Sequence, residues 1–266
     1  MSRVEKARSG RGAHDPVSRR GLLVGLALAV AMPLGLLVAG GLLQVTTDGA
    51  LSSVAGNYIQ AAADAVLLVL VVVVVTVTGL RWSPVLRETR RRRSVVAVVL
   101  LGLWALLTVA QVLFTLDAGT GSYLLSVLVV VTLVAVVEEL IYRGVLITGL
   151  RSALPEWGVW LGSVVLFALA HSVADLSSGF VLPDAFLLSL GSACYAARRV
   201  TGTLAAPVAV HLLFDLAIGL RAQAETAPPV ALQLAAGLVL VGAAVAGAIL
   251  AIRKNPTAQD RDATIR

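Results

Sequence analysis

The chain has 266 residues, of which 58% are hydrophobic and only 14% are charged. A soluble domain carries roughly a quarter of charged residues and cannot bury this much apolar surface. The net charge of +6 does not indicate nucleic-acid binding, because the basic residues lie between apolar runs, where they orient helices and meet anionic lipid headgroups. The composition therefore excludes a soluble globular protein and predicts a protein embedded in a lipid bilayer.

Apolar runs of about 20 residues, each long enough to cross the hydrocarbon core as a helix, recur along the whole chain. They predict an all-α fold, a polytopic transmembrane helical bundle of about eight spans. The predicted spans are Gly21–Leu43, Tyr58–Leu80, Val95–Leu116, Ser122–Leu150, Gly158–Ala174, Phe180–Ala197, Thr203–Leu220 and Val230–Ile252.

The first run follows Arg19 and Arg20, a pattern similar to a twin-arginine export signal. This run is longer than the apolar part of a signal peptide and further spans follow it, so we interpret it as a retained signal anchor. Residues 1–20 are predicted to be a disordered tail.

Lysine and arginine predict the orientation of the spans. Six precede Gly21, six lie between Arg81 and Arg93, and four lie in residues 253–266. Positive residues favour the cytoplasmic side, so we expect a multi-pass protein of the plasma membrane with both termini in the cytoplasm. Arg221 is the exception to this pattern. The run Arg90–Arg93 is typical of a topology stop, with a lipid-binding patch as the alternative.

Three ionisable residues lie close together in the fourth predicted span: Glu138, Glu139 and Arg143. Each such residue costs about 2.5 to 3.5 kcal/mol in a membrane helix, so a protein interior or aqueous cavity must receive them. Glu139 and Arg143 are four residues apart and can pair on one helix face. Glu138 points about 100° away and remains available for another partner.

Candidate partners for Glu138 lie on two later spans. His171 and His211 are the histidines outside the N-terminal tail, and Asp215 follows His211 by one helical turn. At about 1.5 Å per residue from the cytoplasmic ends, these side chains and Glu138 fall in a band about 8 Å deep. We therefore expect them to share one cavity that opens toward the cytoplasm.

Three segments carry these residues, Glu138-Glu139-Leu-Ile-Tyr-Arg143, Phe167-Ala-Leu-Ala-His171 and His211-Leu-Leu-Phe-Asp215. In order and spacing they resemble the EExxxR, FxxxH and HxxxN/D signatures of the CAAX-protease and bacteriocin-processing family. The resemblance covers Ser122 to Gly219. It divides the chain into a tail (1–20), N-terminal helices (21–116), a catalytic core (122–219), a last helix (230–252) and a cytoplasmic tail (253–266).

The resemblance implies an intramembrane endopeptidase similar to the type II CAAX prenyl endopeptidase. Glu138 and His171 would activate the attacking water, Arg143 would hold Glu139, and His211 with Asp215 would stabilise the oxyanion. The expected partners are the bilayer and a peptide or protein substrate, and not nucleic acid, while the oligomeric state is left open. Asp215 fits least well, because the family position is often asparagine and an ionised carboxylate cannot donate a hydrogen bond.

Metal use stays open at this point. Glu138, His171 and His211 would make a two-His, one-carboxylate site for a divalent ion such as zinc, and the same residues could activate water without a metal. Two non-protease functions are also alternatives. One is a non-catalytic membrane scaffold or bacteriocin self-immunity protein. The other is a proton-coupled transporter, although no internal repeat supports it.

Four further residues receive local interpretations. Phe167 would form one wall of the cavity, or else simply be core. Pro207 either loosens the helix before His211 or is an ordinary first-turn proline. Asp64, in the second span, has no evident partner and is expected near the outer interface. Cys194, the one cysteine, is expected to be a small packing residue.

Overall fold

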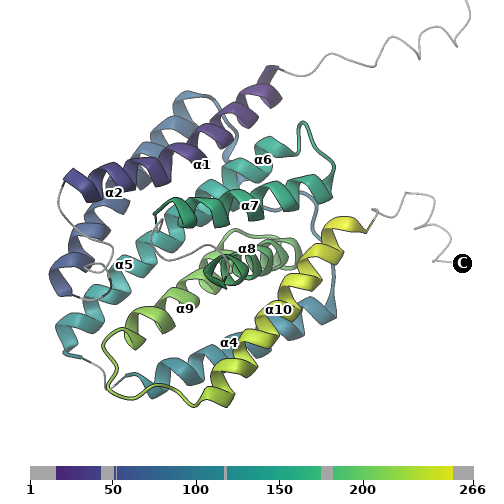
Figure 1. The fold of residues 1–266 in the computed structure, drawn as a ribbon. Helices are drawn as coiled ribbons and strands as arrows, with labels where there is room; N and C mark the ends of the chain where they lie inside the picture. The colour runs from purple at the N-terminus through teal and green to yellow at the C-terminus, as the bar shows by residue number, and fades with distance from the viewer. Residues whose placement is uncertain (1–15, 43–50, 52, 117–118, 175–181, 254–266) are drawn as a thin grey trace, which may run out of the picture.

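The computed structural model describes residues 16–42, 51, 53–116, 119–174 and 182–253, and these residues form helices joined by short turns (Figure 1). Within those ranges there is no β-strand, and one isolated antiparallel bridge joins Arg87 to Thr203. The helices are α1 (Pro16–Leu42), α2 (Val54–Val77), α3 (Trp82–Leu86), α4 (Val95–Phe114), α5 (Gly121–Glu139), η3 (Leu140–Leu146), α6 (Ile147–Leu150), α7 (Glu156–Ala174), α8 (Leu182–Thr201), α9 (Ala205–Arg221) and α10 (Val230–Ile252).

Four helical segments in the described part of the chain are long and apolar enough to cross a membrane. They are α2, α4, the continuous run Gly121–Leu150 formed by α5, η3 and α6, and α10. A shorter apolar helix covers Glu156–His171. The all-helical fold is therefore confirmed, whereas the count of about eight spans is not confirmed and stays a prediction.

Side-chain caps explain where several helices begin. Ser53, Ser94 and Thr120 accept hydrogen bonds from backbone N–H groups in the first turns of α2, α4 and α5, which satisfies donors that the helix itself cannot. The start of α1 corrects the predicted tail, because residues 16–20 are helical. Residues 1–15 and 254–266 of the two predicted tails lie outside the described residues.

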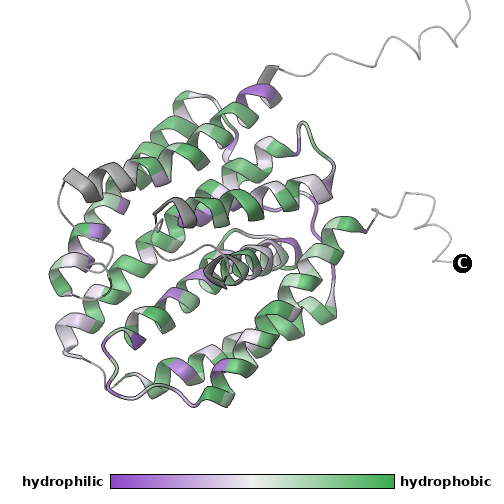
Figure 2. Cartoon of the chain, in the orientation of Figure 1, coloured by the Kyte–Doolittle hydropathy of each residue, from purple (hydrophilic) through white to green (hydrophobic). Residues whose placement is uncertain are grey.

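The run from α5 to α6 lies inside the bundle and supplies much of the core. It packs against α1, α2, α7 and α9, and Ile141, Tyr142 and Leu146 of η3 are fully buried. Leu106 of α4 and Leu238 of α10 instead expose about 70% of their surface. Figure 2 shows such apolar residues along the outer helices, as expected of surfaces that face lipid.

The first residues of α1 and the last residues of α10 lie on the same side of the molecule (Figure 1). The arginine-rich connection before α4 lies on this side too, because Arg92 donates a hydrogen bond of 2.7 Å to the carbonyl of Arg253. The basic segments with described residues thus gather at one end of the bundle.

Candidate active site

Four helical elements bring the six candidate residues together. Glu138 and Glu139 end α5 and Arg143 lies in η3, while His171 comes from α7 and both His211 and Asp215 come from α9. Glu139, Arg143 and His211 expose 1% or less of their surface, and Glu138 exposes 6%. The structure therefore forms one buried polar cluster from residues that are up to 77 positions apart in the sequence, counting from 138 to 215.

A single carboxylate oxygen links two of the three sequence motifs. Oε1 of Glu139 accepts hydrogen bonds from Nη1 of Arg143 at 2.9 Å and from Nδ1 of His211 at 3.0 Å. The pairing of Glu139 with Arg143, expected from their spacing, is present. The carboxylate also fixes the orientation of the His211 ring, because it accepts the hydrogen bond from Nδ1.

Glu138 occupies a different position, facing both histidines. Its Oε2 lies 3.6 Å from Nε2 of His171 and 3.8 Å from Nε2 of His211, and this buried oxygen has no hydrogen-bond partner in the described part. Nε2 of His211 is also 3.4 Å from Oδ2 of Asp215. Separations of this length between polar atoms are those that a bridging molecule spans.

The hydrogen bonds of the two rings determine which nitrogen carries the proton. Nδ1 of His171 lies 2.9 Å from the carbonyl oxygen of Phe167, which can only accept. Nδ1 of His211 likewise faces the carboxylate of Glu139, which is paired with Arg143. Both neutral rings therefore carry their proton on Nδ1, and both turn an Nε2 lone pair toward Glu138.

When both rings are neutral, three acceptors converge, namely the two Nε2 atoms and Oε2 of Glu138, whereas protonation of His211 turns its Nε2 into a donor toward Glu138 and Asp215. Acceptors so close repel one another unless a donor or a cation lies among them. A water molecule, which has two protons to donate, satisfies this requirement, and so does a divalent ion. No group of three or more His, Cys, Asp or Glu in the described residues has the geometry of a metal site.

Aromatic packing surrounds the cluster. The ring of Phe167 is fully buried and contacts His171, His211 and Tyr142 at centroid separations of 4.7, 5.6 and 5.4 Å. The guanidinium of Arg143 lies 4.2 Å above the same ring, a cation–π contact. Phe167 therefore separates the cluster from the rest of the core and supports three of its members.

The sequence did not predict that the α5 helix changes its hydrogen bonding directly after Glu139. From Leu140 to Leu146 the chain forms a π-helical turn, a rare and wider helix that is common at functional sites. The cap N–H of Ile147 then bonds the carbonyl of Gly144. In an α-helix it would bond the carbonyl of Arg143.

Pro207 and Cys194 behave as ordinary structural residues. Pro207 lies in the first turn of α9, which begins at Ala205, where a missing N–H costs nothing. The alternative, a helix loosened in front of His211, is therefore wrong. Cys194 is fully buried, as expected of a packing residue.

Asp64, which has no evident partner in the sequence, has one in the structure. Its side chain is 3% exposed inside the bundle and accepts a hydrogen bond of 2.9 Å from Gln60. It is close enough to interact electrostatically with Glu138 and Asp215. The sequence signal was present, since a carboxylate in the middle of an apolar span needs a polar environment.

Gly191 of α8 is a further residue that the sequence did not identify. A Cβ atom at this position would lie 2.9 Å from Nη2 of Arg143 and 3.4 Å from Phe167. The absence of a side chain therefore leaves room for the guanidinium between α8 and the aromatic ring. A glycine within an apolar helix carries no signal of this role until its neighbours are known.

Fold and site together define a class: a helical membrane protein with a buried cluster of carboxylates and imidazoles drawn from several helices. The family of type II CAAX prenyl endopeptidase Rce1-like proteins matches residues 120–217, a range that contains all six site residues. Within this range the resemblance of the three motifs to that family is confirmed. The match supports a CAAX-type intramembrane endopeptidase in general. No significant match occurs among curated proteins or among solved structures.

Proposed function

We propose that this chain is an intramembrane endopeptidase that hydrolyses a peptide bond in a membrane-associated or lipidated protein or peptide. The observation that carries the proposal is the convergence of Oε2 of Glu138 with Nε2 of His171 and Nε2 of His211. These polar atoms lie close together and are suited to holding a water molecule against a scissile carbonyl. The family match supports the same reaction class.

In the proposed mechanism Glu138 is the general base. It removes a proton from the water as the oxygen attacks the carbonyl carbon, and it returns this proton to the leaving amine when the C–N bond breaks. Nε2 of His171 accepts the other hydrogen of the water and so aims its lone pair at the carbonyl. The proton count therefore balances within one turnover.

The second half of the site stabilises the charge on the carbonyl oxygen. When protonated, Nε2 of His211 donates a hydrogen bond to the oxyanion of the tetrahedral intermediate. Glu139, held by Arg143, orients this ring through Nδ1. Asp215, 3.4 Å from Nε2, balances the charge of the protonated ring. This role requires no hydrogen-bond donation from Asp215.

A divalent ion such as zinc would be held by Glu138, His171 and His211, and it would supply Lewis-acid activation of water. The donor types suit such an ion, but the side chains are not arranged as a metal site in the described residues. The mechanism above uses the side chains alone. A chelator arm in the activity assay separates the two routes.

We place the basic end of the bundle in the cytoplasm of a cell with the chain in its plasma membrane, both termini inside. The charge bias of the connections supports this orientation, as does the clustering of basic segments on one side of the molecule (Figure 1). Substrate would then reach the pocket from the cytoplasmic leaflet.

The test uses purified protein in detergent micelles with two fluorogenic peptides that end in Cys-aliphatic-aliphatic-X, one farnesylated on the cysteine and one not. Glu138→Gln keeps the size of the side chain and removes the base, so cleavage should fall about 10² to 10⁴-fold. The matched control is Glu225→Gln, an exposed glutamate in the turn before α10, which should cleave like the wild type.

Two results would change the proposal. Equal cleavage by Glu138→Gln and wild type would refute the role of Glu138 and favour the non-catalytic scaffold or self-immunity protein. Cleavage that disappears with a chelator and returns with zinc would replace the metal-free mechanism with the metal-assisted one.

A further inference from the structure

The end of α3 and the connection that follows it dock along the turn between α8 and α9. We call residues 84–92 the strap. The N–H of Glu88 donates to the carbonyl of Gly202 at 3.0 Å, and the N–H of Arg92 donates to the carbonyl of Arg199 at 2.8 Å. The N–H of Leu204 donates in return to the carbonyl of Leu86. Backbone hydrogen bonds therefore fix the strap against the start of the helix that carries His211.

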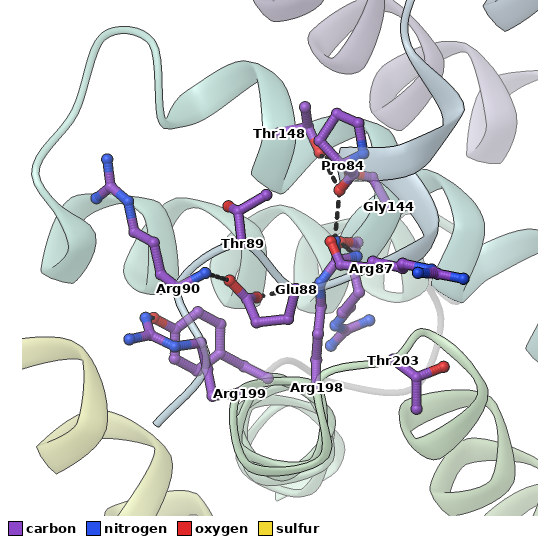
Figure 3. Close-up of polar contacts among 12 residues, drawn as sticks. Pro84, Arg87, Glu88, Thr89, Arg90, Gly144, Thr148, Arg198, Arg199 and Thr203 are labelled. Carbon is purple, nitrogen blue, oxygen red and sulfur yellow. Dashed lines mark hydrogen bonds and ion pairs between the residues drawn. The ribbon is translucent and has the colours of Figure 1, made fainter. Parts of the chain in front are cut away.

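Arg198, at the end of α8, joins the strap to the active-site helix. Its side chain is completely buried, and all five of its N–H donors are used, the maximum for a guanidinium. The acceptors are Oε2 of Glu88 for Nε, the carbonyls of Val85 and Arg143 for Nη1, and the carbonyls of Pro84 and Arg87 for Nη2. Figure 3 shows Arg198 beneath the strap.

The bond from Arg198 to the carbonyl of Arg143 reaches the π-helical turn. In an α-helix the N–H of Ile147 would donate to this carbonyl, whereas here it donates to the carbonyl of Gly144. A donor from α8 therefore bonds a backbone carbonyl in the middle of the π-helical turn.

The strap supports the same turn from its other side. The hydroxyl of Thr148 lies 2.7 Å from the carbonyl of Gly144 and 3.1 Å from that of Pro84. A Cβ atom on Gly144 would lie 3.0 Å from the side chain of Val85. The turn and the strap are thus in close contact, with Arg198 bonded to both.

Charge is balanced within this contact. A buried guanidinium bonded only to neutral carbonyls would be costly, and Glu88 supplies the compensating carboxylate, 3.3 Å from Nε of Arg198. Glu88 also pairs with Arg151 at 2.8 Å and accepts the N–H of Arg90 at 2.6 Å. The network is built to hold Arg198 in one place.

We propose that Arg198 is a positioning residue of the active site, which fixes the π-helical turn so that the side chain of Arg143 meets Glu139 and thereby orients His211. Arg198 acts through the backbone and does not touch substrate. The inference rests on the proposed function for its effect on catalysis. Its structural part, the fixing of the turn by Arg198 and the strap, stands independently of it.

The test compares Arg198→Lys with Arg199→Lys in the purified full chain in micelles. Lysine keeps the charge but has three donors for five acceptors. Arg199 is an apt control, since it is the adjacent arginine and is equally buried. Its Nη1 bonds Glu156 and the hydroxyl of Tyr195, and not η3. Glu88→Gln is a second variant that removes the compensating charge without changing Arg198.

Two readouts are measured, amide hydrogen exchange in residues 140–148 and cleavage of the farnesylated peptide. Losing two hydrogen bonds predicts exchange about 10 to 100 times faster in Arg198→Lys. The kcat should fall about tenfold or more with KM within about twofold, because the turn aligns catalytic groups rather than binding substrate. Glu88→Gln should shift both readouts in the same direction, and Arg199→Lys should change neither.

Equal exchange in the Arg198→Lys and Arg199→Lys proteins would overturn the inference, and so would a change in KM alone. If the wild-type protein fails to cleave the peptide, the proposed function is at fault. The exchange measurement still decides whether Arg198 fixes the turn.

Discussion

Replacing Arg143 with methionine tests how the two motifs on α5 and α9 depend on each other. Methionine has a similar length and no charge, so Arg143→Met keeps most of the packing against Phe167 and removes the ion pair. Glu139 would then remain fully buried, with the ring of His211 and the thiol of Cys194 as its hydrogen-bond partners. A buried carboxylate without its cation is the costly half of a broken ion pair.

Breaking a buried pair in this way costs about 3 to 5 kcal/mol. For a chain of this size the expected fall in the midpoint of thermal unfolding is on the order of 10 °C. The assay is circular dichroism of the purified protein in micelles. Arg221→Met is the matched control: Arg221 is exposed on α9 and bonds the neutral Gln233, so its midpoint should stay within about 2 °C of the wild type.

The double variant Glu139→Gln, Arg143→Met separates stability from catalysis. Because the unpaired carboxylate of Glu139 is removed, the midpoint of thermal unfolding should recover more than half of the fall seen in Arg143→Met. Cleavage should remain reduced by about tenfold or more, since nothing then holds the group that orients His211. A double variant no more stable than Arg143→Met would refute the buried-charge explanation, and full activity in the double variant would refute the orienting role of Glu139.

Two further predictions concern Gly191 and Glu156. In Gly191→Ala the new methyl group would displace the guanidinium of Arg143, so cleavage should fall. The control Gly242→Ala, whose Cβ would lie at an ordinary 3.5 Å from Leu100, should retain activity. Equal activities of the two variants would refute the steric argument. Glu156 begins α7 ahead of its apolar stretch. Burial alone would raise its pKa, but the hydrogen bond and charge of Arg151, with Arg199 and Tyr195, lower the pKa from 4.5 to about 2. A lowered pKa stabilises the folded state above pH 4.5, and this stabilisation is lost as the pH falls toward 2. The difference in unfolding midpoint between wild type and Glu156→Gln should therefore be full at pH 7 and shrink between pH 4.5 and 2; a constant difference would contradict the assigned ion pairs.

The sequence was sufficient to predict those features that depend on local pattern. The limits of α10 are as predicted, Val230–Ile252, because a long apolar run between polar ends leaves little choice. The pairing of Glu139 with Arg143 followed from helical spacing. The joining of His171 and His211 to Glu138 followed from the cost of polar groups in hydrocarbon.

Features that depend on contacts between distant segments were not predicted. The π-helical turn after Glu139 has no local signal that we recognise, and the side chain that bonds the carbonyl of Arg143 in this turn comes from α8. The surroundings of Asp64 were not predicted, because hydropathy does not show which face of a helix meets a neighbouring helix. The role of Arg198 was not indicated by the sequence, because most of its acceptors are backbone carbonyls, which every sequence has and no pattern displays.

The docking of the strap bears on how the protein is made and on how it can be divided. Residues 84–92 are synthesised before α8. Their backbone groups and Glu88 therefore have no partners in residues 198–204 until that later segment has been made. The segment matched by the family, residues 120–217, contains every candidate catalytic side chain but not these acceptors. A truncated chain that keeps only this segment would retain the candidate catalytic side chains and lose the acceptors in the strap that hold Arg198. The unit of folding is therefore larger than the unit of sequence recognition.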